Sequence, residues 1–326
     1  MIAYKITVKS LGRITQLLDS QKIFGAIVYL LSSKLVKEKV DQFVLEISVN
    51  TRIFMVSNLV PKDHFPTPYG DIENGDKKIY QRLKKKKFIP AELLEKPIRN
   101  VEKFVKIEEN QDAKYRISNE FFNTPGLKND LFSIPTVEIL EVVQEASELK
   151  VIREITDFDF YLAFEEKNEI TSKILELLQK LKSDKEIFLY GQKVSQGYNT
   201  YLIEKIKPIS NLSWEDATCF LNLGMLLPND ENQIIDYTQS KFKLFTSERR
   251  PYQMGIGQGK FERDNNFISF VEAGSVIKLK SNLEGSTVDK LRQVGKSVDS
   301  PYQPKNEKRI VFGQSFLYPL KEVPKL

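Results

Sequence analysis

Apolar and polar residues alternate at the start of the chain, and the period of the pattern then changes. Alternation over residues 2–9 predicts a strand, and apolar residues at every fourth position over 23–35 predict a helix after it. Alternation returns over 43–49 and predicts a second strand, and a hairpin at 50–51 leads into a third strand at 53–56. This β-α-β-β order is typical of a ferredoxin-like or RNA-recognition-motif-like (RRM-like) domain.

The first predicted helix contains two informative features. Asp19 or Ser20 can cap its N-terminus, because both side chains accept hydrogen bonds from free backbone amides. Gly25 lies inside the helix, where glycine lowers helix stability. We therefore expect Gly25 to permit a close approach between the helix and a sheet or a ligand.

A second unit with the same order of elements begins near residue 151. The pattern predicts a strand over 158–164, an amphipathic helix over 170–181, and strands at 187–190 and 198–205. A helix at about 213–223 and a strand-rich C-terminal part are expected to complete the chain.

These patterns predict an α+β protein with two ferredoxin-like domains. The first domain is expected over 1–150 and the second over 151–326. Residues 57–135 show no clear period, and a stretch of this length inside a compact domain is typical of a functional insertion. We therefore expect an irregular insertion in the N-terminal half.

Composition narrows the possible functions. A hydrophobic content of 41% and a charged content of 29% are those of a globular protein, and the strand-like start of the chain does not resemble a signal peptide. We expect a cytoplasmic protein without a membrane segment. One cysteine, Cys219, and one histidine, His64, exclude an internal disulfide and a metal site built from several cysteines or histidines.

Catalytic chemistry has little support in the sequence. No Ser–His–Asp or Cys–His arrangement is indicated, and His64 in its proline-flanked loop is expected to be a surface histidine. Asp157 and Asp159 could hold a metal from one side of a strand, but exposed polar positions of an amphipathic strand explain the spacing equally well. We expect no catalytic residue, no metal and no cofactor.

Charge is distributed unevenly along the chain. The net charge is only +5, yet the segment from Lys77 to Lys87 holds seven basic residues and no acidic one. The segment from Glu138 to Glu169 holds ten acidic residues and three basic ones. This asymmetry indicates one face for a polyanion and another for a protein neighbour or solvent. The lysine cluster can equally be a solvated loop.

A glycine-bearing loop follows the predicted strand at 187–190. Gly191 and Gly197 would let the backbone approach a phosphate, and Lys193 and Ser195 could bind its oxygens. The loop lacks the GK[ST] and the following helix of a Walker loop. On spacing alone, a flexible hairpin loop explains it as well.

A second basic feature is the pair Arg249–Arg250. Adjacent arginines can make forked contacts to phosphates, and the nearby Tyr252 offers a ring face to a base. The alternative is a solvated surface turn.

Four segments, in this order and spacing, carry a resemblance to a known family. They are Asp19–Ala26 (DSQKIFGA), Tyr190–Tyr198 (YGQKVSQGY), Phe270–Ile277 (FVEAGSVI), and Phe312–Phe316 (FGQSF) running into Tyr318–Leu320. Together they resemble the family of fourth subunits of type III-A CRISPR (Csm) complexes, within the RAMP superfamily. The chain departs from the family at Asn199, where the glycine-rich loop often ends Gly-x-Gly, and at Gly12–Arg13, where the family commonly has a different polar turn.

The resemblance implies two RAMP domains, a thumb-like hairpin in the insertion and a role without catalysis. Members bind the five-prime, repeat-derived handle of the CRISPR RNA, contact the large polymerase-like Csm subunit and a backbone Csm subunit, and meet target RNA indirectly through the thumb. The residues expected to bind the handle come from both halves of the chain. They are Arg13, Ser20, Lys22, Gly191, Lys193, Ser195, Gly197, Arg249 and Arg250.

Two other functions remain open at this point. A RAMP-type endoribonuclease that processes CRISPR precursor RNA would use histidine, tyrosine or lysine as general acid and base, with His64 and Lys193 as candidates. A general single-stranded RNA-binding module would bind RNA regardless of the repeat sequence.

Overall fold

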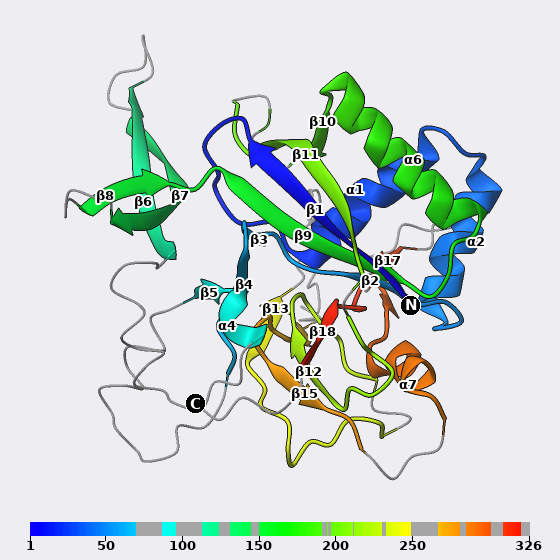
Figure 1. Ribbon diagram of the computed structural model, residues 1–326. Helices are drawn as coiled ribbons and strands as arrows, with labels where there is room; N and C mark the ends of the chain where they lie inside the picture. The colour runs from blue at the N-terminus through cyan, green and yellow to red at the C-terminus, as the bar shows by residue number, and fades with distance from the viewer. Residues whose placement is uncertain are drawn as a thin grey trace, which may run out of the picture.

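The computed structural model describes residues 1–69, 87–95, 113–123, 131–144, 150–190, 194, 197–210, 212–229, 233–248, 267–280, 285–300 and 309–320 (Figure 1). The helices are α1 (Ser20–Ser32), α2 (Lys37–Ser48), α4 (Glu92–Glu95), α6 (Glu169–Asp184) and α7 (Thr287–Val294). The strands are β1 (Ile2–Ser10), β2 (Phe54–Val56), β3 (Val60–Pro61), β4 (His64–Pro66), β5 (Phe88–Pro90), β6 (Ala113–Asn123), β7 (Leu131–Gln144), β8 (Lys150–Glu154), β9 (Asp157–Phe164), β10 (Ile187–Tyr190), β11 (Thr200–Ile209), β12 (Cys219–Asn222), β13 (Leu244–Glu248), β14 (Phe267–Val271), β15 (Val276–Lys278), β16 (Val298–Asp299), β17 (Ile310–Val311) and β18 (Leu317–Leu320).

The main sheet has the strand order β10-β11-β1-β9-β2, and β3 also pairs with β9. Its pairings are antiparallel, and Ile6 at the centre of β1 lies opposite Ile206 on β11 and Phe160 on β9. The predicted mixed helix-and-strand class is therefore confirmed. Strands from both sides of residue 150 form this one sheet, so the two predicted β-α-β-β units share a layer. The division into domains at residue 150 stays a prediction.

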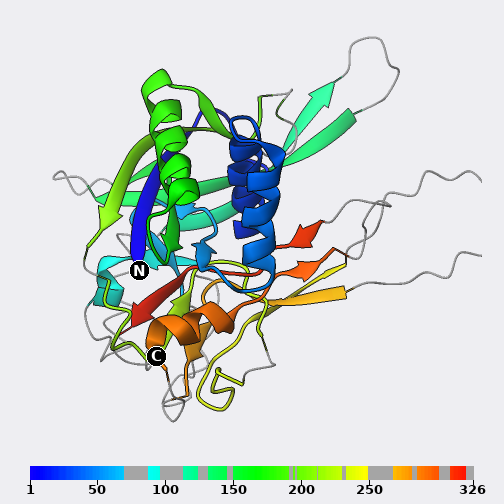
Figure 2. The same cartoon turned by 90° about the vertical axis from the view of Figure 1, so that its right-hand side faces the viewer.

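Helices α1, α2 and α6 cover one face of the main sheet (Figure 2). Asp19 caps α1 by accepting a hydrogen bond from the amide of Lys22 at 2.9 Å, and Asn168 caps α6 through a capping box with Thr171. Both helices lie where the apolar period places them. The expectation for Gly25 is wrong, because this residue is exposed and a Cβ there would have nothing within 4 Å.

The segment 43–49, predicted as a strand, belongs to α2. Phe43 and Ile47 are fully buried, while Leu45 and Val49 are 41% and 55% exposed. Burial of Val40, Phe43 and Ile47 follows the helical period i, i+3, i+7. The alternation of apolar residues over 43–49 is compatible with a strand as well, but it does not match the burial. The helical period prevails because these residues pack against α1.

The predicted insertion is more regular than expected. Strands β6 and β7 form a long antiparallel hairpin, in which Pro135 lies opposite Asn119, and β8 adds a third strand. Shorter strands β4 and β5 pair just before it along the chain. The described part of the predicted insertion at 57–135 therefore contains regular strands, among them the long hairpin β6–β7.

A second layer below the main sheet contains the sheet β15-β12-β18 and helix α7 (Figure 1). The helix predicted over 213–223 is wrong, because residues 219–222 form the fully buried strand β12. The layer is joined to α1 by stacked rings of Phe24 and Phe312, whose centroids lie 4.1 Å apart. No helix among the described residues is long and apolar enough to cross a membrane.

Candidate nucleic-acid interface

The turn at Gly12–Arg13 meets the end of the glycine-rich loop. The amide of Asn199 donates to the carbonyl oxygen of Arg13 at 3.0 Å, and the amide of Leu11 donates to the carbonyl oxygen of Thr200 at 3.0 Å. A Cβ on Gly12 would lie 2.3 Å from the carbonyl oxygen of Gly197, so only glycine permits this approach. Two of the predicted handle-binding residues, Arg13 and Gly197, therefore lie at one place, although they are far apart in sequence.

The hairpin β6–β7 is attached to the same turn. The amide of Val137 donates to the carbonyl oxygen of Ile14 at 2.7 Å, and this contact forms an isolated bridge between the turn and β7. Three segments thus meet here: the start of the chain, the hairpin of the insertion and the end of the glycine-rich loop. We call this meeting point the loop junction.

Asn199 holds the loop junction together. It is fully buried, and its φ of 54° is in the left-handed region, which asparagine tolerates better than other residues with a side chain. Its side-chain oxygen accepts from the amide of Thr15 at 2.8 Å, and its side-chain nitrogen donates to the Thr15 hydroxyl at 2.8 Å. Asparagine thus adopts a left-handed backbone conformation that glycine would also permit, and it adds two hydrogen bonds.

Replacing Asn199 by alanine should lower the free energy of unfolding by about 2–3 kcal/mol. The change leaves the partly buried amide of Thr15 without its partner, and alanine is strained at positive φ without the hydrogen bonds that hold asparagine there. Asn199→Gly loses the same bonds but relieves the backbone, so a smaller loss of about 1–2 kcal/mol is expected. Urea unfolding of the two variants measures the difference. A larger loss for glycine than for alanine would contradict the role given to the backbone.

Ser20 does not face solvent, contrary to the role predicted for it. It is fully buried, its amide donates to the side-chain oxygen of Asn58 at 2.8 Å, and its hydroxyl accepts from the amide of Met225 at 3.0 Å. Ser20 therefore joins the start of α1 to the second layer. Close packing against Gly224 explains why a small residue is needed here, since a Cβ on Gly224 would lie 3.1 Å from the Ser20 Cβ.

Lys22 lies at the exposed start of α1 and pairs with the capping residue. Its Nζ is 3.2 Å from the carboxylate of Asp19, and its side chain is 38% exposed. The negative charge of Asp19 reduces the attraction of the helix N-terminus for an anion. Lys22 can still exchange this exposed partner for a phosphate, because such pairs contribute little free energy.

The remaining predicted contacts lie outside the described residues. These are Gly191, Lys193, Ser195, Arg249 and Arg250, and most of the lysine cluster, of which only Lys87 is described. Whether they converge with the loop junction stays a prediction. Burial lowers the pKa of Lys87, and the positive charge of Lys243 lowers it further.

The two aspartates of β9 form ion pairs. Asp159 is fully buried, accepts from the Thr7 hydroxyl at 2.7 Å and from the Asp63 amide at 2.8 Å, and lies 2.8 Å from the Nζ of Lys5. Asp157 pairs with Lys62 at 3.4 Å. The expectation of exposed polar positions is therefore wrong for Asp159, whose carboxylate anchors the segment after β3 to the main sheet.

The pKa of Lys5 reflects this arrangement. Burial lowers it, but hydrogen bonds and charges from Asp159 and Asp63 outweigh the burial and raise the pKa above its ordinary value. For Asp63, burial acts to raise the pKa, and the hydrogen bond and charge of Lys5 outweigh it and lower the pKa. Burial holds the pKa of the neighbouring Tyr161 well above its ordinary value. The groups are arranged as a charge-paired anchor, and no group of three or more metal-ligating side chains occurs among the described residues.

His64 is buried rather than on the surface. It is 7% exposed, its Nδ1 lies 2.8 Å from the carbonyl oxygen of Lys62, and its Nε2 is buried without a hydrogen-bond partner. The short bond to a carbonyl oxygen means that Nδ1 carries the proton. The surface position expected for His64 is wrong. Cys219 is also buried, and burial raises the pKa of its thiol to about 11.

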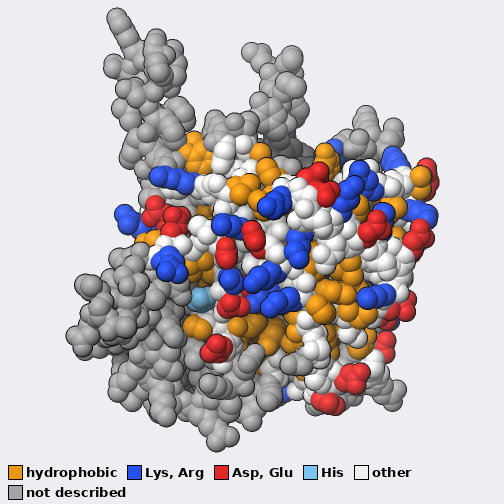
Figure 3. Space-filling model, turned by 45° about the horizontal axis from the view of Figure 1, so that its top comes forward, with side chains coloured by type: hydrophobic (Ala, Val, Ile, Leu, Met, Phe, Trp, Pro, Cys, Tyr) orange, Lys and Arg blue, Asp and Glu red, His pale blue; other side chains and the backbone are white. Residues whose placement is uncertain are grey.

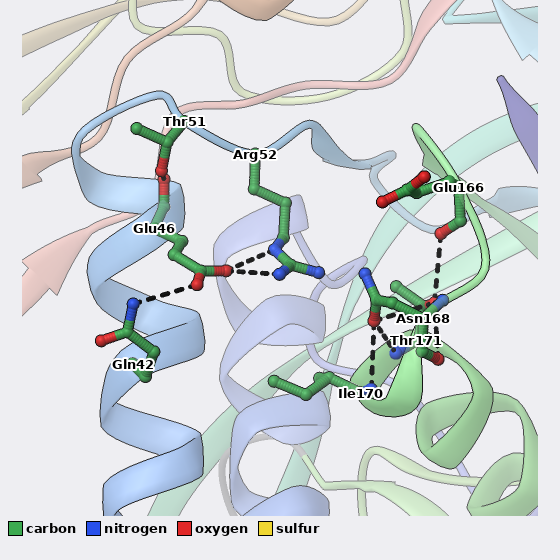
Figure 4. Close-up of polar contacts among 8 residues, drawn as sticks. All are labelled: Gln42, Glu46, Thr51, Arg52, Glu166, Asn168, Ile170 and Thr171. Carbon is green, nitrogen blue, oxygen red and sulfur yellow. Dashed lines mark hydrogen bonds and ion pairs between the residues drawn. The ribbon is translucent and has the colours of Figure 1, made fainter.

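A polar pocket of about 330 Å³ opens between the end of α2 and the start of α6 (Figure 4). Arg52 and Glu46 form a short double contact in it, with Nε and Nη2 of the arginine 2.6 Å and 2.5 Å from one carboxylate oxygen. A hydrogen bond from Gln42 and the pair with Arg52 lower the pKa of Glu46. The pocket borders Phe164, at the far end of β9 from the residues that pair with Lys9, so it is separate from the loop junction.

Lysines on the main sheet form a feature that the sequence reasoning did not single out. Lys9 on β1 and Lys205 and Lys207 on β11 are exposed, and we call them the lysine strip. Basic side chains gather on this face, with acidic ones between them (Figure 3). The alternation of lysine with apolar residues in KITVK and EKIKP is the signal that could have identified them.

Comparison with protein-family models and with curated protein sequences finds no match. Among solved structures, a chain in a crystal structure of the Csm3–Csm4 subcomplex of the type III-A CRISPR–Cas interference complex is similar, with a TM-score of 0.55, 16% identity, and coverage of 99% of this chain and 100% of that one. A chain in the Csm1–Csm4 cassette in complex with pppApA gives a TM-score of 0.53 and 13% identity over 99% of each chain. The cassette in complex with cA4 gives 0.53 and 13% over 98% of each. From end to end, this chain therefore has the fold of a chain found in Csm subcomplexes.

Proposed function

We propose that the chain is an RNA-binding subunit of a type III-A CRISPR effector complex, in the position that Csm4 holds in the structures it resembles. The observation that carries the proposal is the similarity of fold to a chain of the Csm3–Csm4 subcomplex and to a chain of the Csm1–Csm4 cassette. In both comparisons the similarity covers nearly the whole length of the two chains. Csm4 is the component that these subcomplexes have in common. This likeness agrees with the four sequence segments that resemble the same family.

The ligand that we propose is the five-prime handle of the CRISPR RNA. A single-stranded handle presents phosphates, 2′-hydroxyls and unstacked bases, which proteins of this kind bind with loops and sheet faces. The loop junction supports this proposal, because it brings Arg13 and the end of the glycine-rich loop beside the β6–β7 hairpin. Backbone from three segments can thus approach one strand of RNA.

The partners that we propose are the large polymerase-like Csm subunit and a backbone Csm subunit. The names of the subcomplexes that contain the similar chains, Csm1–Csm4 and Csm3–Csm4, support two Csm partners, and the kinds of subunit are those that the family resemblance implies. Target RNA would be met indirectly, through the hairpin β6–β7 as a thumb. In this role the chain holds the guide RNA and links two subunits.

We further propose that the chain does not cleave RNA. His64 is buried beside a backbone carbonyl, and Asp159 is committed to Lys5 and Thr7, so neither is placed to exchange a proton with a ribose hydroxyl. Purified chain incubated with a repeat-containing precursor RNA should leave that RNA intact. Cleavage that disappears in His64→Ala would establish the endoribonuclease alternative in its place.

Affinity purification tests the proposed assembly. A tagged chain, expressed together with its genomic neighbours, should co-purify with a large polymerase-like subunit, a backbone subunit and short RNAs that share one five-prime sequence. Sequencing of the bound RNA gives that five-prime end. Recovery of RNAs with unrelated ends and without Csm-type subunits would favour a general single-stranded RNA-binding module and contradict the proposal.

A further inference from the structure

The face of the main sheet opposite the helices is buried at Thr7, Asp159 and Tyr161 and carries exposed lysines on β11 and at the end of β1. On β1, Lys5, Thr7 and Lys9 point to the side opposite Ile6 and Val8, because successive side chains alternate across a strand. Helices α1, α2 and α6 lie on the other side of the sheet (Figure 2). The register places Lys207 directly opposite Lys5 and Lys205 directly opposite Thr7.

The lysine strip has no ion-pair partner within the described part of the chain. Lys5 forms ion pairs with Asp159 and Asp63, and Lys62 forms one with Asp157, which lies opposite Lys9. Lys9, Lys205 and Lys207 remain exposed without such a pair. The acidic residue closest to them along β11, Glu204, is set outside the register by a bulge.

Lys207 lies opposite Lys5, whose charge is compensated by Asp159 and Asp63, and Lys205 lies opposite the uncharged Thr7. Lys9, Lys205 and Lys207 therefore carry the uncompensated charge among the described residues of this face, and they would attract an anionic ligand. The described aromatic side chain opposite Lys5 on β9, Tyr161, is 3% exposed, so a base has no ring to stack on there. The face is therefore suited to phosphates rather than to bases.

The strip is continuous with the loop junction. Lys9 is followed directly by Ser10 and the Gly12–Arg13 turn, and β11 begins beside Asn199. From Lys9 to Lys5, which lies opposite Lys207, the strand extends by about 13 Å. A strand of RNA leaving the loop junction along β1 would pass over these side chains.

We propose that the lysine strip is a binding site for the sugar–phosphate backbone of single-stranded RNA, in continuation of the loop junction. The inference rests on the proposed function in one respect, the identity of the polyanion as RNA. The strip binds phosphates and does not read the base sequence. It therefore holds the RNA segment that follows the part of the handle bound by the loops. It adds affinity and direction to the path of the RNA, and it does not select the RNA.

Replacement of the strip by glutamine tests the site in the full-length chain. The variant combines Lys9→Gln, Lys205→Gln and Lys207→Gln. The matched control combines Lys34→Gln, Lys180→Gln and Lys182→Gln, which remove the same charge from exposed lysines on the helical side of the molecule. Fluorescence anisotropy measures the binding of two probes, a single-stranded RNA with the repeat-derived handle and an unrelated RNA of equal length, over a series of NaCl concentrations.

The strip variant should lose affinity for both probes, on the order of 50-fold at 0.15 M salt, and its plot of log K against log salt should be shallower by about 2, since each contact to a single-stranded phosphate contributes about 0.7 to that slope. The control should keep the wild-type slope and affinity, and urea unfolding should show that both variants are folded. Equal slopes for strip variant and control would overturn the proposal. So would a strip variant that binds RNA like the wild type but no longer co-purifies with the other subunits, because the strip would then bind an acidic protein surface.

The two proposals fail in different ways. If the wild type binds handle RNA and the strip variant binds it with the same slope, the strip proposal fails and the proposed function stands. If the wild type co-purifies with no CRISPR RNA, yet the strip variant loses affinity for both probes, the proposed function fails and the strip proposal stands. A wild type that binds neither probe overturns both.

Discussion

Replacing Lys5 by methionine should lower the free energy of unfolding by about 3–5 kcal/mol, the range found when one partner of a buried ion pair is removed. Methionine keeps most of the volume of the lysine stem and removes the ammonium group. The carboxylate of Asp159, which is fully buried, then keeps only the Thr7 hydroxyl and the Asp63 amide as partners. Urea unfolding at pH 7 measures the loss.

The effect should depend on pH in a defined direction. The pKa of Lys5 is raised, so its stabilisation is present below the ordinary value of 10.5 and is lost as pH rises through the higher folded pKa. The pKa of Asp63 is lowered, so its stabilisation is present above the ordinary value of 3.8 and is lost as pH falls through the lower folded pKa. The difference between wild type and Lys5→Met should therefore be greatest between these two values and shrink outside them.

Lys62→Met is the matched control for this prediction. Lys62 lies on the same face and pairs with Asp157, but the two side chains are 38% and 36% exposed and their charged atoms are 3.4 Å apart. An exposed pair of this kind contributes less than about 1 kcal/mol. Equal losses in Lys5→Met and Lys62→Met would show that burial of Asp159 does not decide the effect.

Replacing Gly12 by alanine should destabilise the protein by about 3 kcal/mol and weaken binding of a handle RNA by roughly tenfold. The added Cβ would lie 2.3 Å from the carbonyl oxygen of Gly197, and neither backbone segment can move without breaking the hydrogen bond from the Asn199 amide to Arg13. The change therefore separates Arg13 from the glycine-rich loop. Urea unfolding and fluorescence anisotropy with handle RNA measure the two effects.

Gly25→Ala should act in the opposite direction. This glycine is exposed in the interior of α1, and the added Cβ would meet nothing within 4 Å, so alanine should stabilise the protein by about 0.5–1 kcal/mol through its higher helix propensity. RNA affinity should stay unchanged. Destabilisation by both glycine replacements, or by neither, would contradict the importance given to the loop junction.

The contrast between the two glycines illustrates what a sequence can predict here. Gly25 is conspicuous in the sequence because it interrupts a helical pattern, yet a Cβ at this position would have nothing within 4 Å. Gly12 lies in a turn, where glycine is ordinary, and its close neighbour, Gly197, is far away in the chain. When glycine is required because a distant segment packs against it, the neighbouring sequence gives no signal of this requirement. The loop junction could therefore be found only from the three-dimensional structure.

Local periodicity predicted the elements that are strongly amphipathic. Helices α1 and α6 and strands β1, β9 and β10 lie where their apolar residues place them. Two segments were assigned wrongly, because short apolar runs fit more than one period. Residues 43–49 satisfy both periods until Leu45 and Val49 are known to be exposed, and β12 is a buried run without any period.

The candidate site was predictable only in part for a related reason. Arg13 and Gly197 both lie at the loop junction and their contact with RNA stays a prediction, whereas Ser20 serves the packing of α1 on the second layer. The sequence alone does not distinguish a serine at a helix start that binds a ligand from one that binds a buried backbone amide. The lysine strip was missed because two separate strands contribute to it, and their register follows from a bulge between Thr7 and Val8 that no local pattern indicates.

The position of β1 in the middle of the main sheet has a consequence for folding. Its two neighbours are β9, which ends at Phe164, and β11, which ends at Ile209, so the first strand stays without either hydrogen-bonded neighbour until much of the chain has been synthesised. Contacts of such long sequence separation slow folding, and unpaired strand edges favour aggregation in the meantime. Fragments cut near residue 150 should accordingly fail to fold alone but could reassemble when the two pieces are mixed, since neither piece contains a complete main sheet.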